Sequence, residues 1–201
     1  MRSQKERQSY ILDHPLRLTP VASDQITQEQ SQAISSLWSV IGIPPKAELP
    51  EYFALMLNHP DLMLAQTEYA TQLLDSQLTP RHRQLIICRI GWLCGAPYEW
   101  SQHLKNGKTN ADLTSDDAER LIQGSNAEGW SDDDKWLLKA VEELFHDAMI
   151  TDETWAKLTV FLNPKQLIEL PLLAGYYQSV AYLQNTLRCR LMPGSKGLLS
   201  R

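Results

Sequence analysis

Signals that start helices recur along this chain, and they constrain its fold more than any other feature. Each start pairs a side chain that can cap a helix N-terminus with a proline in the first turn or with an acidic residue three positions later. Four of these starts are Thr79-Pro80, Thr114 with Asp117, Ser131 with Asp134, and Asn163-Pro164. Almost nothing alternates with the period of two that is typical of strands. The chain is therefore predicted to be all-α.

Helical periodicity and these starts predict helices at about 26–41, 50–57, 60–76, 80–94, 97–108, 115–123, 131–147, 151–159 and 164–187. Pro171 is predicted to kink or split the last of them. The run from Gly42 to Pro50, with Pro44 and Pro45 adjacent, is interpreted as a hinge. Residues 1–49 then form an N-terminal helical arm, 50–191 the main domain and 192–201 a C-terminal tail.

Composition narrows the classes of partner and of cellular location. The formal net charge of −5 argues against a phosphate-binding surface, so we expect no nucleic-acid partner. No stretch approaches the roughly 20 apolar residues that cross a bilayer, and the charged N-terminus does not resemble a signal peptide. We expect a cytoplasmic protein without a membrane partner. The cysteines Cys88, Cys94 and Cys189 have no Cys-x-x-Cys spacing and are interpreted as buried thiols.

The segment from Pro80 to Cys94 is apolar nearly all round, which is typical of a central helix. Arg89 lies within it, and a buried guanidinium must be paired or reach a polar cavity. Either Arg89 forms an ion pair with Glu99 or Glu169, or it anchors a substrate carboxylate. Glu169 is in turn interpreted as the partner of Arg89 or as a second carboxylate of a pocket.

Glu99 and His103 carry the clearest chemical signal. Pro97 begins a helix on which the two residues stand four apart, so a carboxylate and an imidazole share one face. Such a pair can transfer protons near neutral pH, because the carboxylate orients the imidazole. Two ligands one turn apart do not complete a metal site, so no metal is expected. A solvated surface pair is the alternative for an isolated Glu-x-x-x-His.

The surrounding sequence resembles the long form of the carboxymuconolactone decarboxylase-like family from about Glu51 to Leu191. The matching runs are Leu78-Thr79-Pro80-Arg81-His82-Arg83-Gln84-Leu85, Ile87-Cys88-Arg89-Ile90, Tyr98-Glu99-Trp100-Ser101-Gln102-His103, Gln166-Leu167-Ile168-Glu169-Leu170 and Asn185-Thr186-Leu187. The resemblance implies an all-α, AhpD-like fold around a buried helical hairpin. It also implies homo-oligomers, either trimers or hexamers, and a small-molecule substrate without a cofactor.

The family includes decarboxylases of an aromatic-degradation lactone and the alkylhydroperoxidase AhpD, whose motif is a Glu, a Cys-x-x-Cys pair and a His. Placing His103 on that His puts Glu99 at the second cysteine, Ala96 at the first, Tyr98 at an intervening His and Gln84 at the upstream Glu. A peroxidase of this kind needs a thiolate and a resolving thiol, which these residues do not supply.

The expected function is a small-molecule enzyme, decarboxylase-like or isomerase-like, acting on a lactone or carboxylated substrate. Glu99 and His103 are the expected catalytic residues. The expected pocket residues are Gln84, Arg89, Tyr98, Trp100 and Glu169. Two alternatives remain: an AhpD-like peroxidase that works through a single thiol such as Cys94, and a non-catalytic oligomer that binds a ligand.

Overall fold

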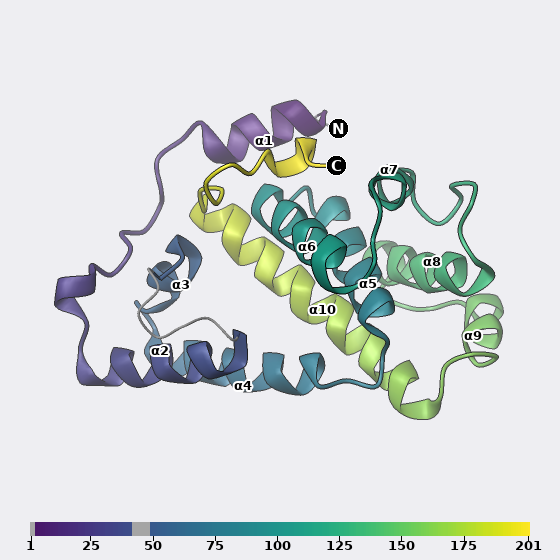
Figure 1. The fold of residues 1–201 in the computed structure, drawn as a ribbon, viewed down its shortest axis with the longest axis horizontal. Helices are drawn as coiled ribbons and strands as arrows, with labels where there is room; N and C mark the ends of the chain where they lie inside the picture. The colour runs from purple at the N-terminus through teal and green to yellow at the C-terminus, as the bar shows by residue number, and fades with distance from the viewer. Residues whose placement is uncertain (1–2, 42–48) are drawn as a thin grey trace.

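The computed structural model describes residues 3–41 and 49–201, and every regular element in this part of the chain is helical (Figure 1). The α-helices are α1 (Gln4–Leu12), α2 (Gln28–Ile41), α3 (Glu51–Met56), α4 (Pro60–Leu74), α5 (Pro80–Leu93), α6 (Pro97–Asn110), α7 (Ser115–Gln123), α8 (Asp132–Asp147), α9 (Asp152–Leu158) and α10 (Pro164–Leu187). Two 3₁₀ turns, η1 (Ser23–Gln25) and η2 (Gly197–Leu199), complete the set. The predicted all-α class is confirmed.

Each helix predicted from the sequence is present, and the caps explain why their starts were readable. Thr79, Thr114, Ser131 and Asn163 all accept hydrogen bonds from backbone N–H groups of the first turn of their helices. Helix α1 was not predicted. Its start does carry a signal, a capping box in which Ser3 and Glu6 bond reciprocally.

Pro171 was predicted to kink or split this helix, and the split is excluded because α10 runs without a break from Pro164 to Leu187. A proline in a helix interior removes one backbone hydrogen bond. Leu170, Leu173 and Ala174 beside it are buried in the main hydrophobic core. Their burial offsets the missing bond and keeps the helix continuous.

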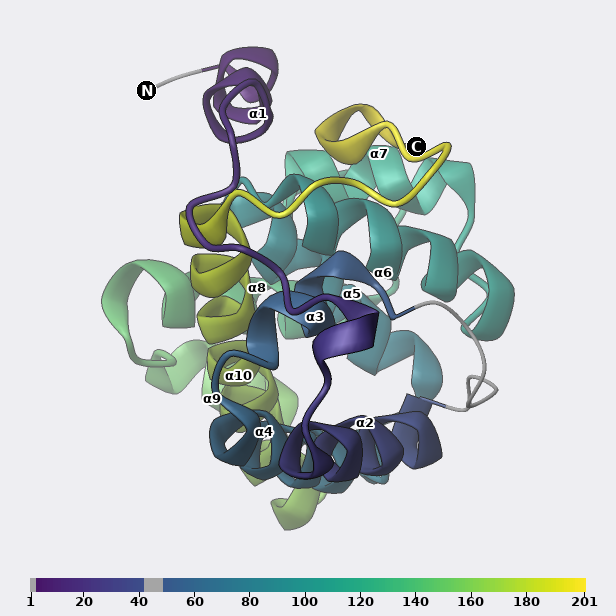
Figure 2. The ribbon, with the colours of Figure 1, turned by 90° about the vertical axis from the view of Figure 1, so that its left-hand side faces the viewer.

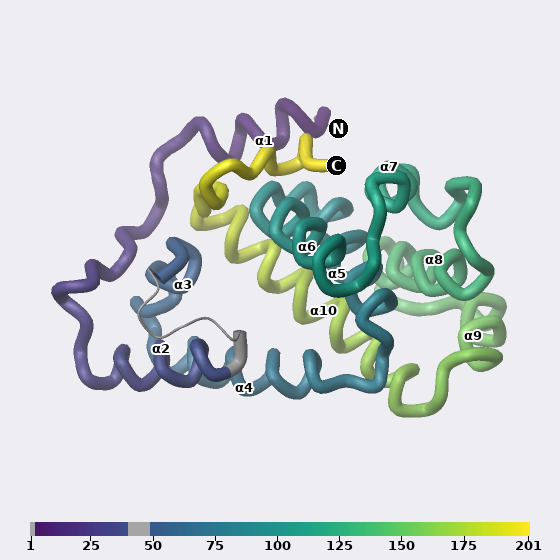
Figure 3. Tube along the Cα trace, viewed as in Figure 1, coloured from purple at the N-terminus to yellow at the C-terminus, as the bar shows by residue number. Residues whose placement is uncertain are grey.

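Helix α5 is the centre of the fold, as its apolar character predicted. Its residues from Leu85 to Trp92 are all buried, and it packs against α6, α7, α8 and α10. The trace in Figure 3 shows α5 and α6 side by side, with α10 running past them. Gly91 permits this close approach, because a Cβ there would lie 3.3 Å from the backbone nitrogen of Trp100. The expected buried hairpin is therefore α5–α6.

The N-terminal arm packs along the main domain. Helices α2 and α4 lie side by side at the lower edge of Figure 2. Ala33 and Leu37 of the arm share a second hydrophobic cluster with Leu55 and Met63. Residues 42–48, which include most of the predicted hinge, lie outside the described residues.

Both ends of the chain meet above the α5–α6 turn (Figures 1 and 2). Arg7 of α1 donates hydrogen bonds to the carbonyl oxygens of Gly95, at 3.3 Å, and Cys94, at 3.4 Å. The indole N–H of Trp100 donates to the carbonyl oxygen of Ser200 at 3.2 Å. The turn that leads into the Glu99 helix is thus held by both termini.

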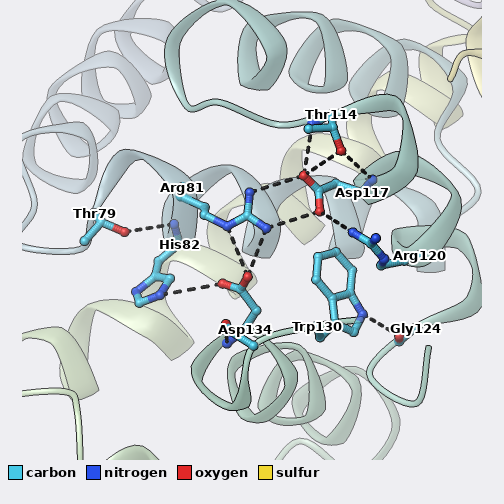
Figure 4. A network of polar contacts seen from close by, with 10 residues as sticks. Thr79, Arg81, His82, Thr114, Asp117, Arg120, Gly124, Trp130 and Asp134 are labelled. Atoms are coloured by element: carbon cyan, nitrogen blue, oxygen red, sulfur yellow. Dashed lines mark hydrogen bonds and ion pairs between the residues drawn. The ribbon is translucent and has the colours of Figure 1, made fainter. Parts of the chain in front are cut away.

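Arg81 ties the start of α5 to the starts of α7 and α8 (Figure 4). Its guanidinium lies between two buried carboxylates, 3.2 Å from Asp117 Oδ1 and 2.9 Å from Asp134 Oδ2. Asp117 also accepts from Arg120 and completes a capping box with Thr114. The arginine of the Leu-Thr-Pro-Arg run therefore has a structural role. None of the helices described is long and apolar enough to cross a membrane.

Candidate active site

Glu99 and His103 meet on one face of α6, as their spacing predicted. Glu99 Oε1 lies 3.1 Å from His103 Nε2. Only 2% of Glu99 is exposed, whereas the His103 side chain keeps 15% of its surface accessible. The pair is therefore not the solvated surface pair that an isolated motif would suggest. Within the described residues, no third His, Cys, Asp or Glu joins it in a metal-binding group.

Helices α5 and α10 fix the pair from opposite sides. Gln184 Nε2 of α10 donates to Glu99 Oε2 at 2.7 Å, and His103 Nδ1 lies 3.2 Å from Gln84 Oε1 of α5. An amide oxygen only accepts, so this contact puts a proton on Nδ1 and leaves Nε2 to face the carboxylate. Three helices thus hold one carboxylate and one imidazole next to each other.

Two oxygens of this site are buried without a hydrogen-bond partner, Glu99 Oε1 and Gln184 Oε1. The imidazole is close to the first of them but is not aligned to donate a hydrogen bond to it. Buried acceptors are nearly always satisfied in folded proteins, and exceptions concentrate where a group has work to do. The site therefore has unused acceptor capacity directed at its own interior.

Four tyrosines lie near enough to Glu99 for its charge to raise their pKa values. Burial raises the pKa of Tyr52, Tyr98, Tyr176 and Tyr177, and the charge of Glu99 raises each of them further. The Tyr177 ring stands edge-on to His103 with 4.9 Å between centroids. The hydroxyl of Tyr52 already donates to Gln66 Oε1 at 3.3 Å. The hydroxyls of Tyr98, Tyr176 and Tyr177 stay protonated at neutral pH and can donate hydrogen bonds to an oxygen of a bound molecule.

Trp100 does not line the site, so its prediction as a pocket residue is wrong. Its side chain is fully buried against Trp92, with ring centroids 4.9 Å apart. Its N–H is used by the C-terminal tail. Tyr98, which was also predicted as a pocket residue, is buried in the second hydrophobic cluster, where its ring centroid lies 6.3 Å from that of Tyr52. The charge of Glu99 raises the pKa of Tyr98.

Arg89 is buried and paired, but its predicted partners and its predicted pocket role are wrong. Its guanidinium contacts Glu142 of α8 at 2.8 Å and donates to the carbonyl oxygen of Leu121 at 2.7 Å. Burial lowers the pKa of Arg89, and the charge of Glu142 opposes that effect. Residue 89 lies on the side of α5 that faces α7 and α8, so this cation is fully engaged away from His103.

Glu169 is likewise not a partner of Arg89, and its carboxylate is occupied outside the pocket. It accepts from the backbone N–H of Gln77 at 3.0 Å and from that of Leu78 at 3.2 Å. These bonds fix the loop that precedes α5. The structure therefore gives Glu169 a structural role.

None of the three cysteines supplies an activated thiol. All are free, and burial raises the pKa of Cys94 and of Cys189 to about 12. Burial also raises the pKa of Cys88 strongly. The charge of Arg7 lowers the pKa of Cys94, but by less than burial raises it. Because the thiolate is the nucleophile in thiol chemistry, these cysteines are poorly reactive at neutral pH.

Gln184 and Tyr177 were not among the predicted site residues. A signal existed, because Leu170, Tyr177 and Gln184 recur every seven residues on one buried face of α10. An amide on a buried face requires a partner. The partner of Gln184, Glu99, is 85 residues away in sequence, so tertiary structure was needed to identify it.

The helical bundle around the buried α5–α6 hairpin matches solved structures that have an AhpD-like fold. An alkylhydroperoxidase AhpD core, an uncharacterized peroxidase-related protein from Ralstonia eutropha JMP134, matches with a TM-score of 0.74 and 14% identity over 90% of this chain and 94% of that one. A protein of unknown function from Agrobacterium tumefaciens matches with a TM-score of 0.62 and 14% sequence identity, and the match covers 68% of this chain and 94% of that protein. The debrominase Bmp8 matches with a TM-score of 0.66 and 14% sequence identity, and the match covers 88% of this chain and 92% of that protein. At these identities the likeness establishes the fold alone.

Residues 60–143 match the model of the Carboxymuconolactone decarboxylase family. The family resemblance drawn from the sequence is confirmed over this segment, which contains the α5–α6 hairpin with Glu99 and His103. A search of curated protein sequences found no significant match.

Proposed function

We propose that this chain is a small-molecule enzyme, a decarboxylase-like lyase or isomerase that uses Glu99 and His103 as its acid–base pair on a lactone or carboxylated substrate. The observation that carries this proposal is the buried 3.1 Å contact between the two side chains. Gln84 and Gln184 hold the pair at both ends. Such preorganisation is typical of groups that move protons during turnover.

In the decarboxylation of a carboxylated lactone, the bond between the ring carbon and its carboxylate breaks and CO₂ leaves. The electron pair that remains takes the Nε2 proton of a doubly protonated His103 ring, and solvent then returns a proton to Nε2. Glu99 orients the ring and stabilises its charged form. Isomerisation would use the same pair to remove a proton at one carbon and return it at another.

Negative charge that develops on a substrate oxygen needs donors, and Arg89 cannot serve because Glu142 holds it. The hydroxyls of Tyr98, Tyr176 and Tyr177 are proposed to donate hydrogen bonds to that oxygen in place of Arg89.

A peroxidase reaction through Cys94 is the second candidate, and the peroxidase-related neighbour favours it. The buried thiol with its raised pKa does not. The debrominase was also solved in complex with 2,3,4-tribromopyrrole, with a TM-score of 0.68 and 13% identity over 89% of this chain and 93% of that one. That complex supports a ring-shaped substrate for this fold, whichever chemistry applies.

We further propose that the protein is a cytoplasmic homo-oligomer, a trimer or hexamer as the family resemblance implies. Large apolar side chains left exposed on the single chain, such as Met149 and Val160, are consistent with subunit contacts. Light scattering on the purified protein measures the assembly directly, and a monomer would remove this part of the proposal.

The proposal is tested by turnover of carboxymuconolactone, followed by CO₂ release, in wild-type protein and in His103→Ala and Glu99→Gln variants. Loss of a positioned acid–base group costs about 10²- to 10⁴-fold in rate. Glu119→Gln, which changes an exposed carboxylate paired with Arg201, is the matched control and should keep wild-type turnover. Unchanged turnover in His103→Ala would remove the proposal.

A further inference from the structure

A groove of about 680 Å³ runs between α4 and α10, close to Glu99 and His103 but not including them. Its walls are apolar, with Met56, Leu62, Leu172 and Leu183 among them. None of its lining residues is charged. The volume lies within the range of small-molecule sites.

One layer of tyrosine rings separates this groove from the acid–base pair. Tyr176 lines the groove and stands edge-on to Tyr177, with centroids 5.1 Å apart, and Tyr177 stands edge-on to His103. Gln66 also lines the groove and accepts the hydroxyl hydrogen of Tyr52 at 3.3 Å. Tyr176 and Tyr177 are therefore the side chains that lead from the groove to His103.

The chemistry on the two sides of this layer restricts what can pass through it. The groove offers no cation to an anionic ligand, and Glu99 beyond it would repel one. The unpartnered oxygens of Glu99 and Gln184 are acceptors, so they complement a hydrogen-bond donor. The apolar walls suit a ring. These three conditions describe an uncharged ring molecule that carries an O–H or N–H group.

We propose that the groove between α4 and α10 is the substrate entrance, that Tyr176 is its gate, and that the substrate is an uncharged ring compound presenting an O–H or N–H donor to Glu99 Oε1. This inference rests on the proposed function and names the substrate class for the same site. Any carboxyl group that such a substrate loses in the reaction must therefore be protonated when the substrate binds.

Gly175 offers a way to block the groove without disturbing the fold. It lines the groove on α10, and a Cβ at this position would meet nothing within 4 Å. Gly175→Trp therefore places an indole at the groove from a position where the Cβ itself meets no neighbour, and circular dichroism verifies that this variant folds. Ile168→Trp is the matched control, because Ile168 lies on the same helix, is 63% exposed and does not line the groove.

The probes are β-naphthol, its methyl ether and β-naphthoate, which share a ring system and differ in the donor and the charge. Binding to the full-length protein is measured by naphthalene fluorescence at neutral pH. We expect β-naphthol to bind about tenfold more tightly than the ether, because only it satisfies a buried acceptor. Glu99→Leu, checked for folding by circular dichroism, should abolish that preference. Gly175→Trp should abolish binding of both, and Ile168→Trp should leave it unchanged.

Tighter binding of β-naphthoate than of β-naphthol would overturn the proposal, as would unchanged binding in Gly175→Trp. A change of assembly mass in Gly175→Trp, measured by light scattering, would overturn it by identifying the groove as a contact between copies of this chain. Binding is independent of turnover, so the two proposals fail separately. His103→Ala should still bind β-naphthol, and normal turnover in that variant would remove the proposed function alone.

Discussion

Removal of the Glu142 carboxylate should destabilise this protein more than removal of any exposed acid. Glu142 Oε1 accepts from Arg89 Nε at 3.0 Å and from the backbone N–H of Ser125 at 2.8 Å, and Oε2 accepts from Ser125 Oγ at 2.6 Å. The Arg89 side chain is only 9% exposed. Glu142→Ala therefore leaves a buried guanidinium without a counter-charge.

The magnitude follows from that burial. Breaking a buried ion pair by removing one partner costs about 3–5 kcal/mol in the free energy of unfolding. For a chain of this size each kcal/mol lowers the melting temperature by about 2–4 °C, so we expect a fall of about 6–20 °C. Replacing both partners, as in Arg89→Met with Glu142→Leu, should recover part of the loss, because no charge is then left unpaired.

Thermal unfolding followed by circular dichroism, with urea titration for the free energy, measures both effects. Glu119→Ala is the control, since Glu119 is 55% exposed in its pair with Arg201 and should cost less than about 1 kcal/mol. The reasoning is refuted if Glu142→Ala melts within the error of Glu119→Ala, since Arg89 would then not depend on Glu142.

Three further predictions concern charge, sulfur and positioning. Burial alone would raise the pKa of Asp117, but hydrogen bonds from Arg81 and from the Thr114 cap outweigh burial and lower this pKa from its ordinary value of 3.8. The stability that Asp117 adds is therefore present above about pH 4 and is lost as the pH falls further. Urea titrations of wild type and Asp117→Asn should give the same free energy of unfolding in acid and different values at neutral pH. Cys94 should react with a disulfide reagent at pH 8 far more slowly in the folded protein than in urea, and equal rates would contradict its burial. Gln184→Leu should lower kcat about tenfold with little change in KM while the fold is retained, and a wild-type kcat would show that Glu99 does not need this support.

Local features of the fold were predictable from the sequence, because helix caps and contacts one turn apart depend on neighbouring residues. The start of α10 at Asn163-Pro164 and the contact of Glu99 with His103 are of this kind. Helix α1 was overlooked because it has no apolar stripe, although its cap lies in the sequence.

Long-range partners were not predictable in the same way. Arg89 was correctly expected to be paired, yet its partner Glu142 lies 53 residues away, and nothing in either neighbourhood distinguishes it from Glu99 or Glu169. Glu169 accepts a hydrogen bond from the backbone N–H of Gln77, which is 92 residues away in sequence. Which carboxylate reaches which donor is decided by how α5, α8 and α10 pack, and helical periodicity does not specify that packing.

The central claim is that this AhpD-like chain works by proton transfer and not through a thiol. The most direct measurement compares Cys94→Ser with His103→Gln for turnover of one substrate, with folding verified for both. We predict that Cys94→Ser keeps wild-type turnover and that His103→Gln loses about 10²-fold or more. Loss of turnover in Cys94→Ser together with normal turnover in His103→Gln would contradict the claim.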